Sequence, residues 1–111
     1  MPLDVKDIAG LRTDYPGVPD DYLEFLGSTG HGMFGSLTIY NGLVEPTFIF
    51  GNSERHLDSR YRAFADFNGD VIAAFDLKSW AVVEMDESRS INVTDETFST
   101  FIDRWLTIIE G

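Results

Sequence analysis

The sequence contains no cysteine among its 111 residues. This absence excludes disulfide bonds and any metal site built on thiolate ligands, and it suits a reducing compartment, so we expect the protein in the cytoplasm. The sequence also lacks an apolar run long enough to cross a bilayer. Its first segment, MPLDVKDIAG, lacks the basic region and apolar stretch of a signal peptide. We therefore expect neither membrane insertion nor export.

Basic residues are scarce in this chain. Eight Lys and Arg stand against 19 Asp and Glu, which gives a formal net charge of −11. No Lys or Arg occurs from Thr13 to Glu54, and a second acidic stretch, EMDESRSINVTDE, holds five acids and one arginine. Such a charge repels nucleic acid and anionic membranes, and it accelerates encounter with a basic protein. The alternative is that the charge only keeps the protein soluble.

The apolar pattern predicts the fold class. Helices are expected over about residues 4–13, 19–27 and 95–109, the last with Thr94 as its cap. Strands are expected over residues 37–40, 47–50, 71–75 and 81–85, with a hairpin turn at Asn41-Gly42 and a helical turn within residues 51–62. Residues 71–75 are apolar throughout, as in a strand covered on both faces. These elements predict a single α+β domain with a central, mostly antiparallel, twisted sheet of about 4 to 6 strands, flanked by N-terminal helices and a C-terminal amphipathic helix.

The segment DFNGD, residues 66–70, has the spacing of the first half of a calcium loop. Asp66, Asn68 and Asp70 stand where the first three oxygen ligands would be. However, Val71 replaces the glycine that the loop needs for its sharp turn, and Leu77 replaces the bidentate glutamate. An Asn-Gly pair between two strand-like segments favours a tight turn. We therefore interpret DFNGD as a hairpin turn and expect no metal site.

The segment GHGMFG matches the spacing G-x-G-x-x-G of dinucleotide-binding loops at Gly30, Gly32 and Gly35. Such a loop follows a strand and opens a helix, whereas here a helix is expected before it and a strand after it. No Lys or Arg lies nearby to meet phosphate charge. We interpret the segment as a glycine-rich connection from helix to strand and expect no cofactor.

No motif points to catalysis. His31 and His56 lack the spacing of a metal pair, and Ser28 lacks the strand-turn-helix context of a hydrolase nucleophile. Folding could bring two carboxylates together as in glycoside hydrolases, so a small carboxylate-dependent hydrolase stays open as an alternative. We expect a non-enzymatic protein without catalytic residues.

Four segments, in order, resemble the SUKH superfamily, the Smi/Knr-like domain shared by fungal cell-wall-assembly regulators and bacterial toxin-immunity proteins. They are VPDDYLEFLGSTGHGMFG, FADFNGDVIAAFD, WAVVEMD and TFSTFIDRWL, and they cover most of the chain from Val18 to Leu106. The matched positions, such as Pro19, Tyr22 and Gly69, determine the fold, so no catalytic residue is carried over. The resemblance implies an α+β fold and, for small bacterial members, neutralisation of a cognate toxin by direct binding.

The charge and the resemblance lead to the same mechanism: an acidic inhibitor is steered to a basic toxin, such as a nuclease, and covers its active site. The predicted contact residues are acids on the exposed side of the second helix and around the sheet turns, namely Asp20, Asp21, Glu24, Asp66, Asp70, Glu84, Asp86 and Glu87. The less regular stretch from Leu43 to Arg60 is where a partner-specific surface could differ. A regulatory or adaptor domain with a non-toxin partner remains an alternative, and so do acids that are merely solvated.

Overall fold

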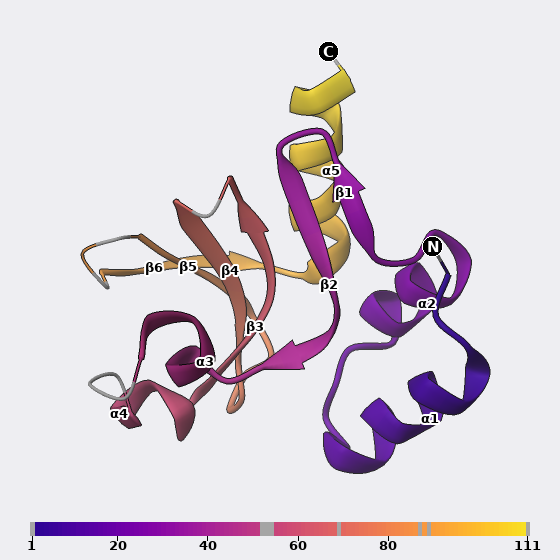
Figure 1. The fold of residues 1–111 in the computed structure, drawn as a ribbon, viewed down its shortest axis with the longest axis horizontal. Coiled ribbons are helices and arrows are strands. Elements are labelled where there is room, and N and C mark those ends of the chain that lie inside the picture. Colours follow the sequence, from indigo (N-terminus) through magenta and orange to yellow (C-terminus); the bar gives the residue numbers. More distant parts are fainter. Residues whose placement is uncertain (1, 52–54, 69, 87, 89, 111) are drawn as a thin grey trace.

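Six antiparallel strands form one sheet, and they lie side by side in the order in which they occur in the sequence. The structure, a computed structural model, describes residues 2–51, 55–68, 70–86, 88 and 90–110. The strands are β1 (Gly32–Phe34), β2 (Leu37–Val44), β3 (Tyr61–Phe67), β4 (Val71–Asp76), β5 (Val82–Met85) and β6 (Ile91–Glu96). The helices are α1 (Val5–Asp14), α2 (Asp20–Ser28), α3 (Pro46–Phe50), α4 (Arg55–Asp58) and α5 (Phe98–Glu110) (Figure 1).

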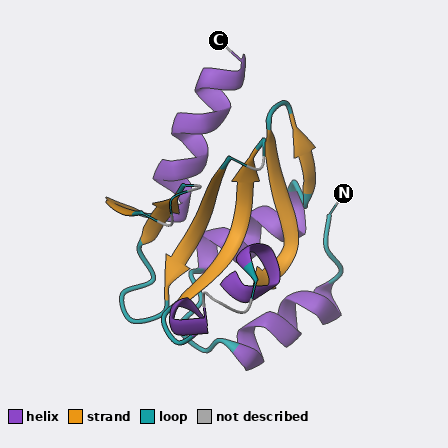
Figure 2. Cartoon of the chain, turned by 60° about the vertical axis from the view of Figure 1, so that its left-hand side comes forward, coloured by secondary structure: helices purple, strands orange, loops and turns teal. Residues whose placement is uncertain are grey.

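Helices cover the sheet from both sides (Figure 2). The larger apolar cluster joins α2 and α5 to one face of the sheet and includes Tyr22, Leu26, Phe64, Phe75, Phe98 and Phe101. The smaller cluster joins α3 and α4 to the other face and includes Ile49, Leu57, Ala63, Ile72, Ala74 and Met85. This arrangement confirms the predicted α+β class, with helices at both ends of the chain and antiparallel strands between them.

The larger cluster is built mainly from aromatic rings. The rings of Phe64 and Phe75 stack with their centroids 4.5 Å apart. The ring of Tyr22 meets Phe75 and Phe98 edge-on, with centroid distances of 5.2 and 5.1 Å. Ring pairs of this kind contribute about 0.5–1.5 kcal/mol each beyond the burial of their apolar area. They fix the position of α2 and α5 on the sheet.

The structure confirms the predictions for β4 and for the DFNGD turn. β4 is buried on both faces, because Ala73 and Phe75 belong to the larger cluster and Ile72 and Ala74 to the smaller one. DFNGD joins β3 to β4, which are antiparallel neighbours. Asn68 has the positive φ of 57° that an Asn-Gly turn requires. The helical turn expected within residues 51–62 is also present, as α4.

The strand predicted over residues 47–50 is wrong, because Pro46–Phe50 forms the helix α3. Proline at the first helical position is favourable, since its missing N–H would have no partner there. The Asp58 carboxylate accepts hydrogen bonds from the Thr47 amide (3.0 Å) and the Thr47 hydroxyl (2.7 Å). This cap, supplied by α4, overrides the β propensity of the segment.

The hairpin turn predicted at Asn41-Gly42 is also wrong, because both residues lie inside β2. The pairing of β2 with β3 shifts register between Ile39 and Val44, and Asn41 and Gly42 lie within this irregularity. The first hairpin turn comes earlier, between β1 and β2, where Gly35 has a φ of 65°. The glycine-rich segment after α2 therefore contains a strand of its own, β1.

The C-terminal helix begins later than predicted. Residues 91–96 form β6, which the sequence did not suggest, and α5 starts at Phe98. Thr94 is therefore not a cap, and its hydroxyl donates to the carbonyl oxygen of Val82 at 2.7 Å. Thr97 precedes the helix instead: its carbonyl accepts from the Phe101 amide at 3.0 Å.

Candidate protein-interaction site

The three predicted contact residues of α2 have different surroundings. Asp20 forms an exposed ion pair with Arg12 of α1 at 3.0 Å. Asp21 accepts hydrogen bonds from the amide (3.0 Å) and the hydroxyl (2.8 Å) of Ser99 in α5. Glu24 is exposed, one turn further along the helix. Asp20 and Asp21 therefore also hold helices together, whereas Glu24 presents its carboxylate to solvent.

Asp70 and Asp86 lie together at one end of the sheet. With Val71 and Ser88 they line a shallow depression of about 370 Å³. The Ser88 hydroxyl donates to Asp86 at 2.6 Å, and the Ser90 amide donates at 3.2 Å. The hydrogen bond from the Ser88 hydroxyl is the largest influence on the pKa of Asp86, and together with the backbone donors it outweighs desolvation and lowers that pKa. Asp86 thus shapes the turn between β5 and β6 and stays ionised.

Asp66 and Glu84 take part in contacts within the protein. The Tyr40 hydroxyl donates to Asp66 at 2.9 Å, and burial together with this hydrogen bond raises the pKa of Tyr40. Glu84 forms an ion pair with Arg104 at 2.8 Å, and Arg104 pairs with Glu96 at the same distance. Glu87 lies outside the residues that the structure describes.

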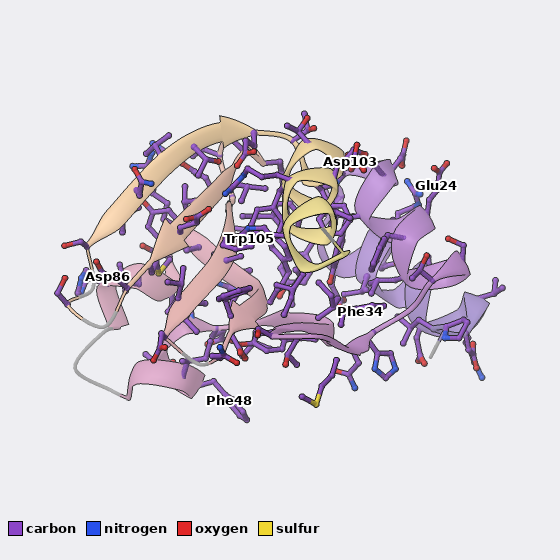
Figure 3. All side chains as sticks on the ribbon, turned by 90° about the horizontal axis from the view of Figure 1, so that it is seen from above. Glu24, Phe34, Phe48, Asp86, Asp103 and Trp105 are labelled. Atoms are coloured by element: carbon purple, nitrogen blue, oxygen red, sulfur yellow. The ribbon has the colours of Figure 1, made fainter. Side chains whose placement is uncertain are left out.

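The predicted acids do not form one continuous surface. Glu24 and Asp86 lie at opposite ends of the molecule (Figure 3). The structure brings Asp70 and Asp86 together at the hairpin ends, and it separates them from the acids of α2. A partner that contacted all of the predicted residues would have to wrap around the domain.

An open groove of about 470 Å³ lies beside α3, within the stretch where a partner-specific surface was expected. Its described lining residues are Tyr15, Leu43, Val44, Glu45, Thr47 and Phe48. The Phe48 side chain is 85% exposed and projects from α3 into solvent (Figure 3). Exposed aromatic side chains beside apolar surface are typical of protein-binding sites. We refer to these six residues as the Phe48 groove.

Contacts with α4, with Arg62 of β3 and with Trp80 fix the residues that line the Phe48 groove. The cap from Asp58 to Thr47 fixes α3 and with it Phe48. Tyr15 follows the end of α1, and the Arg62 Nε donates to its hydroxyl oxygen at 3.2 Å. The ring of Tyr15 also meets Trp80 edge-on, with the centroids 6.2 Å apart. The groove is therefore preformed, which lowers the entropy cost of binding.

The charge of the Phe48 groove is negative. Glu45 is the only carboxylate among its described lining residues, and its side chain is within hydrogen-bonding reach of Asp58. Desolvation raises the pKa of Asp58, but the hydrogen bonds from Thr47 and the charge of Arg62 outweigh it, so this pKa lies below its usual value. Arg62 donates to the carbonyl oxygens of Asp58 and Tyr61. The described lining residues thus include one acidic side chain and no Lys or Arg.

The sequence prediction missed the Phe48 groove because it assigned Phe48 to a strand. In a strand beside a covered face, Phe48 would alternate with its neighbours and pack inward. The available signal was the order Glu45-Pro46, since proline is frequent at the first position of a helix. Because Pro46–Phe50 is a short helix instead, the side chain of Phe48 points outward.

The residues that the structure describes contain no group of three or more His, Cys, Asp or Glu placed to hold a metal ion. His31 lies just before β1, and His56 lies in α4. None of the described helices combines the length and the apolar character that crossing a membrane requires. Comparisons of the chain with protein-family models, with curated proteins and with solved structures found no match.

Proposed function

We propose that this chain is a non-enzymatic protein-binding module, an immunity protein of the bacterial cytoplasm that neutralises a cognate basic toxin, such as a nuclease, by direct binding. The observation that carries the proposal is that several of the few basic side chains form ion pairs with acids of the same protein. Among the described residues, three basic side chains form ion pairs with acids of the same chain: Arg12 with Asp20, Arg60 with Asp76, and Arg104 with Glu84 and Glu96. With 19 Asp and Glu against eight Lys and Arg, the protein keeps a net charge of −11.

The physical consequence is electrostatic steering. A strongly negative surface accelerates encounter with a positive one, and close charge pairs slow dissociation. Toxins that act on nucleic acid are basic because they bind phosphate. The resemblance of the four segments to the SUKH superfamily agrees with this class of partner.

The test is capture of a partner from a lysate of the source organism, with the purified protein as bait, at about 0.05 M and about 0.5 M NaCl. We expect one basic protein at low salt and its release at high salt. The captured protein should have a toxic activity, assayed first on DNA and RNA, that disappears when one equivalent of this protein is added back. A captured protein whose activity is unchanged by adding this protein back would contradict the proposal.

The exposed Phe48 favours a second candidate, a regulatory or adaptor domain with a non-toxin partner. Binding through an apolar contact depends little on ionic strength. A partner that stays bound at about 0.5 M NaCl and has no activity to inhibit would therefore support the adaptor function over the immunity function.

A further inference from the structure

We propose that the Phe48 groove binds an arginine side chain, together with an adjacent apolar side chain, from a segment of the protein partner. This inference deepens the proposed function and rests on it only in naming the partner as a basic protein. Three features of the groove carry it: an exposed aromatic ring, a carboxylate among the lining residues, and an apolar wall.

The ring and the carboxylate line the same groove, and Glu45 and Phe48 are both exposed. Glu45 is the residue before the first helical position, and the Phe48 amide donates to its carbonyl oxygen at 2.9 Å. A planar guanidinium can stack on the ring of Phe48 and donate to the carboxylate of Glu45, whereas the ammonium of lysine cannot do both with the same geometry.

The protein already holds one of its own arginines in this way. The guanidinium carbon of Arg104 lies 5.0 Å from the centroid of the Trp105 ring. The same side chain forms ion pairs with Glu84 and Glu96, each at 2.8 Å. The Phe48 groove has the corresponding groups, an aromatic ring and the carboxylate of Glu45, on an open surface.

We assign the proposed arginine to another protein, because the arginine side chains that the structure describes are engaged elsewhere. Of the arginines whose side chains the structure describes, Arg12, Arg60 and Arg104 form ion pairs, and Arg62 donates to Tyr15 and to two carbonyl groups. A second copy of the chain would also bring a further net charge of −11 to an acidic groove. An anionic membrane is repelled for the same reason. A basic protein segment is the occupant whose charge complements the groove.

The apolar part of the groove indicates which type of residue lies next to the arginine in the partner segment. Leu43 and Val44 are half-buried and line the groove beside the exposed ring of Phe48. A segment with a leucine, isoleucine or aromatic side chain next to the arginine would bury this surface. Anchors of this kind supply most of the binding energy of small interfaces.

The probe for the test is a random heptapeptide library displayed on phage and selected on the purified wild-type protein. We expect enriched peptides to contain an arginine beside an apolar residue. A synthetic copy of the most enriched peptide should bind about tenfold more weakly to the Phe48→Ser variant and to the Glu45→Gln variant, because each removes one of the two groups that hold the guanidinium. Both positions lie at the surface, and circular dichroism and thermal melting confirm that the variants fold.

The controls remove an exposed apolar side chain and an exposed carboxylate elsewhere on the protein. Val5→Ser removes a side chain that is 83% exposed at the far end of α1 from Tyr15. Asp103→Asn removes one negative charge from an exposed position of α5, away from Phe48 (Figure 3). We expect each control to change the affinity by less than about twofold, as is usual for single exposed charges and apolar groups outside a contact. Equal loss in the controls and in the groove variants would overturn the proposal.

Other outcomes separate this inference from the proposed function. Selection of peptides without arginine, or of no peptide above the level of a Phe48→Ser/Glu45→Gln double variant, overturns the groove assignment. If a salt-released toxin is inhibited equally by wild type and by Phe48→Ser, the immunity function stands and the groove assignment fails. If the selected peptides depend on the groove but the captured partner has no activity to inhibit, the groove assignment stands and the immunity function fails.

Discussion

The carboxylate of Asp21 in α2 accepts hydrogen bonds from both the amide and the hydroxyl of Ser99, in the first turn of α5, across 78 positions of sequence. An acceptor at this place satisfies a helix amide that has no partner within the helix. We expect Asp21→Ala to lower the free energy of unfolding by about 1 kcal/mol, the usual cost of losing a helix cap. Urea denaturation measures this cost.

The neighbouring residue provides the control for that measurement. Asp20 has the same charge, but its ion pair with Arg12 is exposed, with side-chain exposures of 76% and 57%. Exposed pairs contribute about 0–1 kcal/mol, so Asp20→Ala should unfold at nearly the wild-type urea concentration. Equal effects of the two substitutions would show that the contact between Asp21 and Ser99 does not stabilise the fold.

Gly17 lies against the indole ring of Trp80. A Cβ atom at position 17 would lie 2.4 Å from the Trp80 Nε1. The ring cannot move freely, because it also packs on Phe75 with a centroid distance of 5.6 Å. We therefore expect Gly17→Ala to lower the free energy of unfolding by about 1–3 kcal/mol, as overpacking does.

The control for Gly17 is Gly10, in the middle of α1. A Cβ atom there would meet nothing within 4 Å. Alanine is favoured over glycine inside a helix by about 1 kcal/mol, so Gly10→Ala should raise the melting temperature. A gain in stability at both positions would contradict the close contact between Gly17 and Trp80.

The hydroxyl of Tyr22 is buried in the larger apolar cluster and has no hydrogen-bond partner among the described residues. Burial is the main cause that raises the pKa of Tyr22. Removing an unsatisfied buried hydroxyl relieves a desolvation cost, so Tyr22→Phe should leave stability unchanged or raise it by about 1 kcal/mol. The ring contacts with Phe75 and Phe98 would be kept.

Tyr40 provides the contrast, because its hydroxyl donates to Asp66 at 2.9 Å. Tyr40→Phe should therefore lower the free energy of unfolding by about 0.5–1.5 kcal/mol, the net value of one hydrogen bond. Chemical denaturation of both variants beside the wild type gives the comparison. A loss of stability in Tyr22→Phe as large as in Tyr40→Phe would show that the Tyr22 hydroxyl is satisfied in solution.

Acid should destabilise the fold in part through Asp76. This residue is buried at the end of β4, where Arg60 pairs with it at 3.0 Å and the Lys78 amide donates at 2.9 Å. Desolvation raises the pKa of Asp76, but these donors and the charge of Arg60 outweigh it, so the pKa lies below the ordinary value of 3.8. The stability that Asp76 contributes is therefore complete above this ordinary value and is lost as the pH falls through the lowered pKa of the folded state.

We expect Asp76→Asn to be less stable than the wild type at about pH 7 and to lose less stability between about pH 7 and pH 3. Relief of repulsion among the surface acids acts in the opposite direction as the pH falls, but it is nearly the same in both proteins. The difference between the two unfolding curves therefore isolates Asp76. Parallel curves would exclude a lowered pKa at this position.

The parts of the fold that depend on local pattern could be predicted from the sequence. The apolar spacing of α2 and α5 and the uninterrupted apolar residues of β4 report directly on burial. β6 could not be predicted in this way, because its residues, INVTDE, are mostly polar and it is a strand only through pairing with β5. α3 depends likewise on the cap from Asp58, eleven positions away.

The candidate site, too, could be predicted from the sequence only in part. The negative charge follows from composition, but the partner of each acid does not. Glu84 meets Arg104 across 20 positions, and Asp21 meets Ser99 across 78. Pairings over such separations are set by tertiary packing, so the sequence could not show which acids are engaged within the protein. It also could not show that Phe48 points outward.

The two apolar clusters lie on opposite faces of the sheet, and β4 contributes side chains to both. The rings of Phe64, Phe75 and Phe98 lie on one side, and α3 and α4 lie on the other. Of the side chains that line the Phe48 groove, Val44 packs on the smaller cluster and Phe48 is exposed, so these two can be exchanged without repacking the larger, aromatic cluster, against which Tyr15 and Leu43 pack. Related chains could diverge in what they recognise while the same folding core is inherited unchanged.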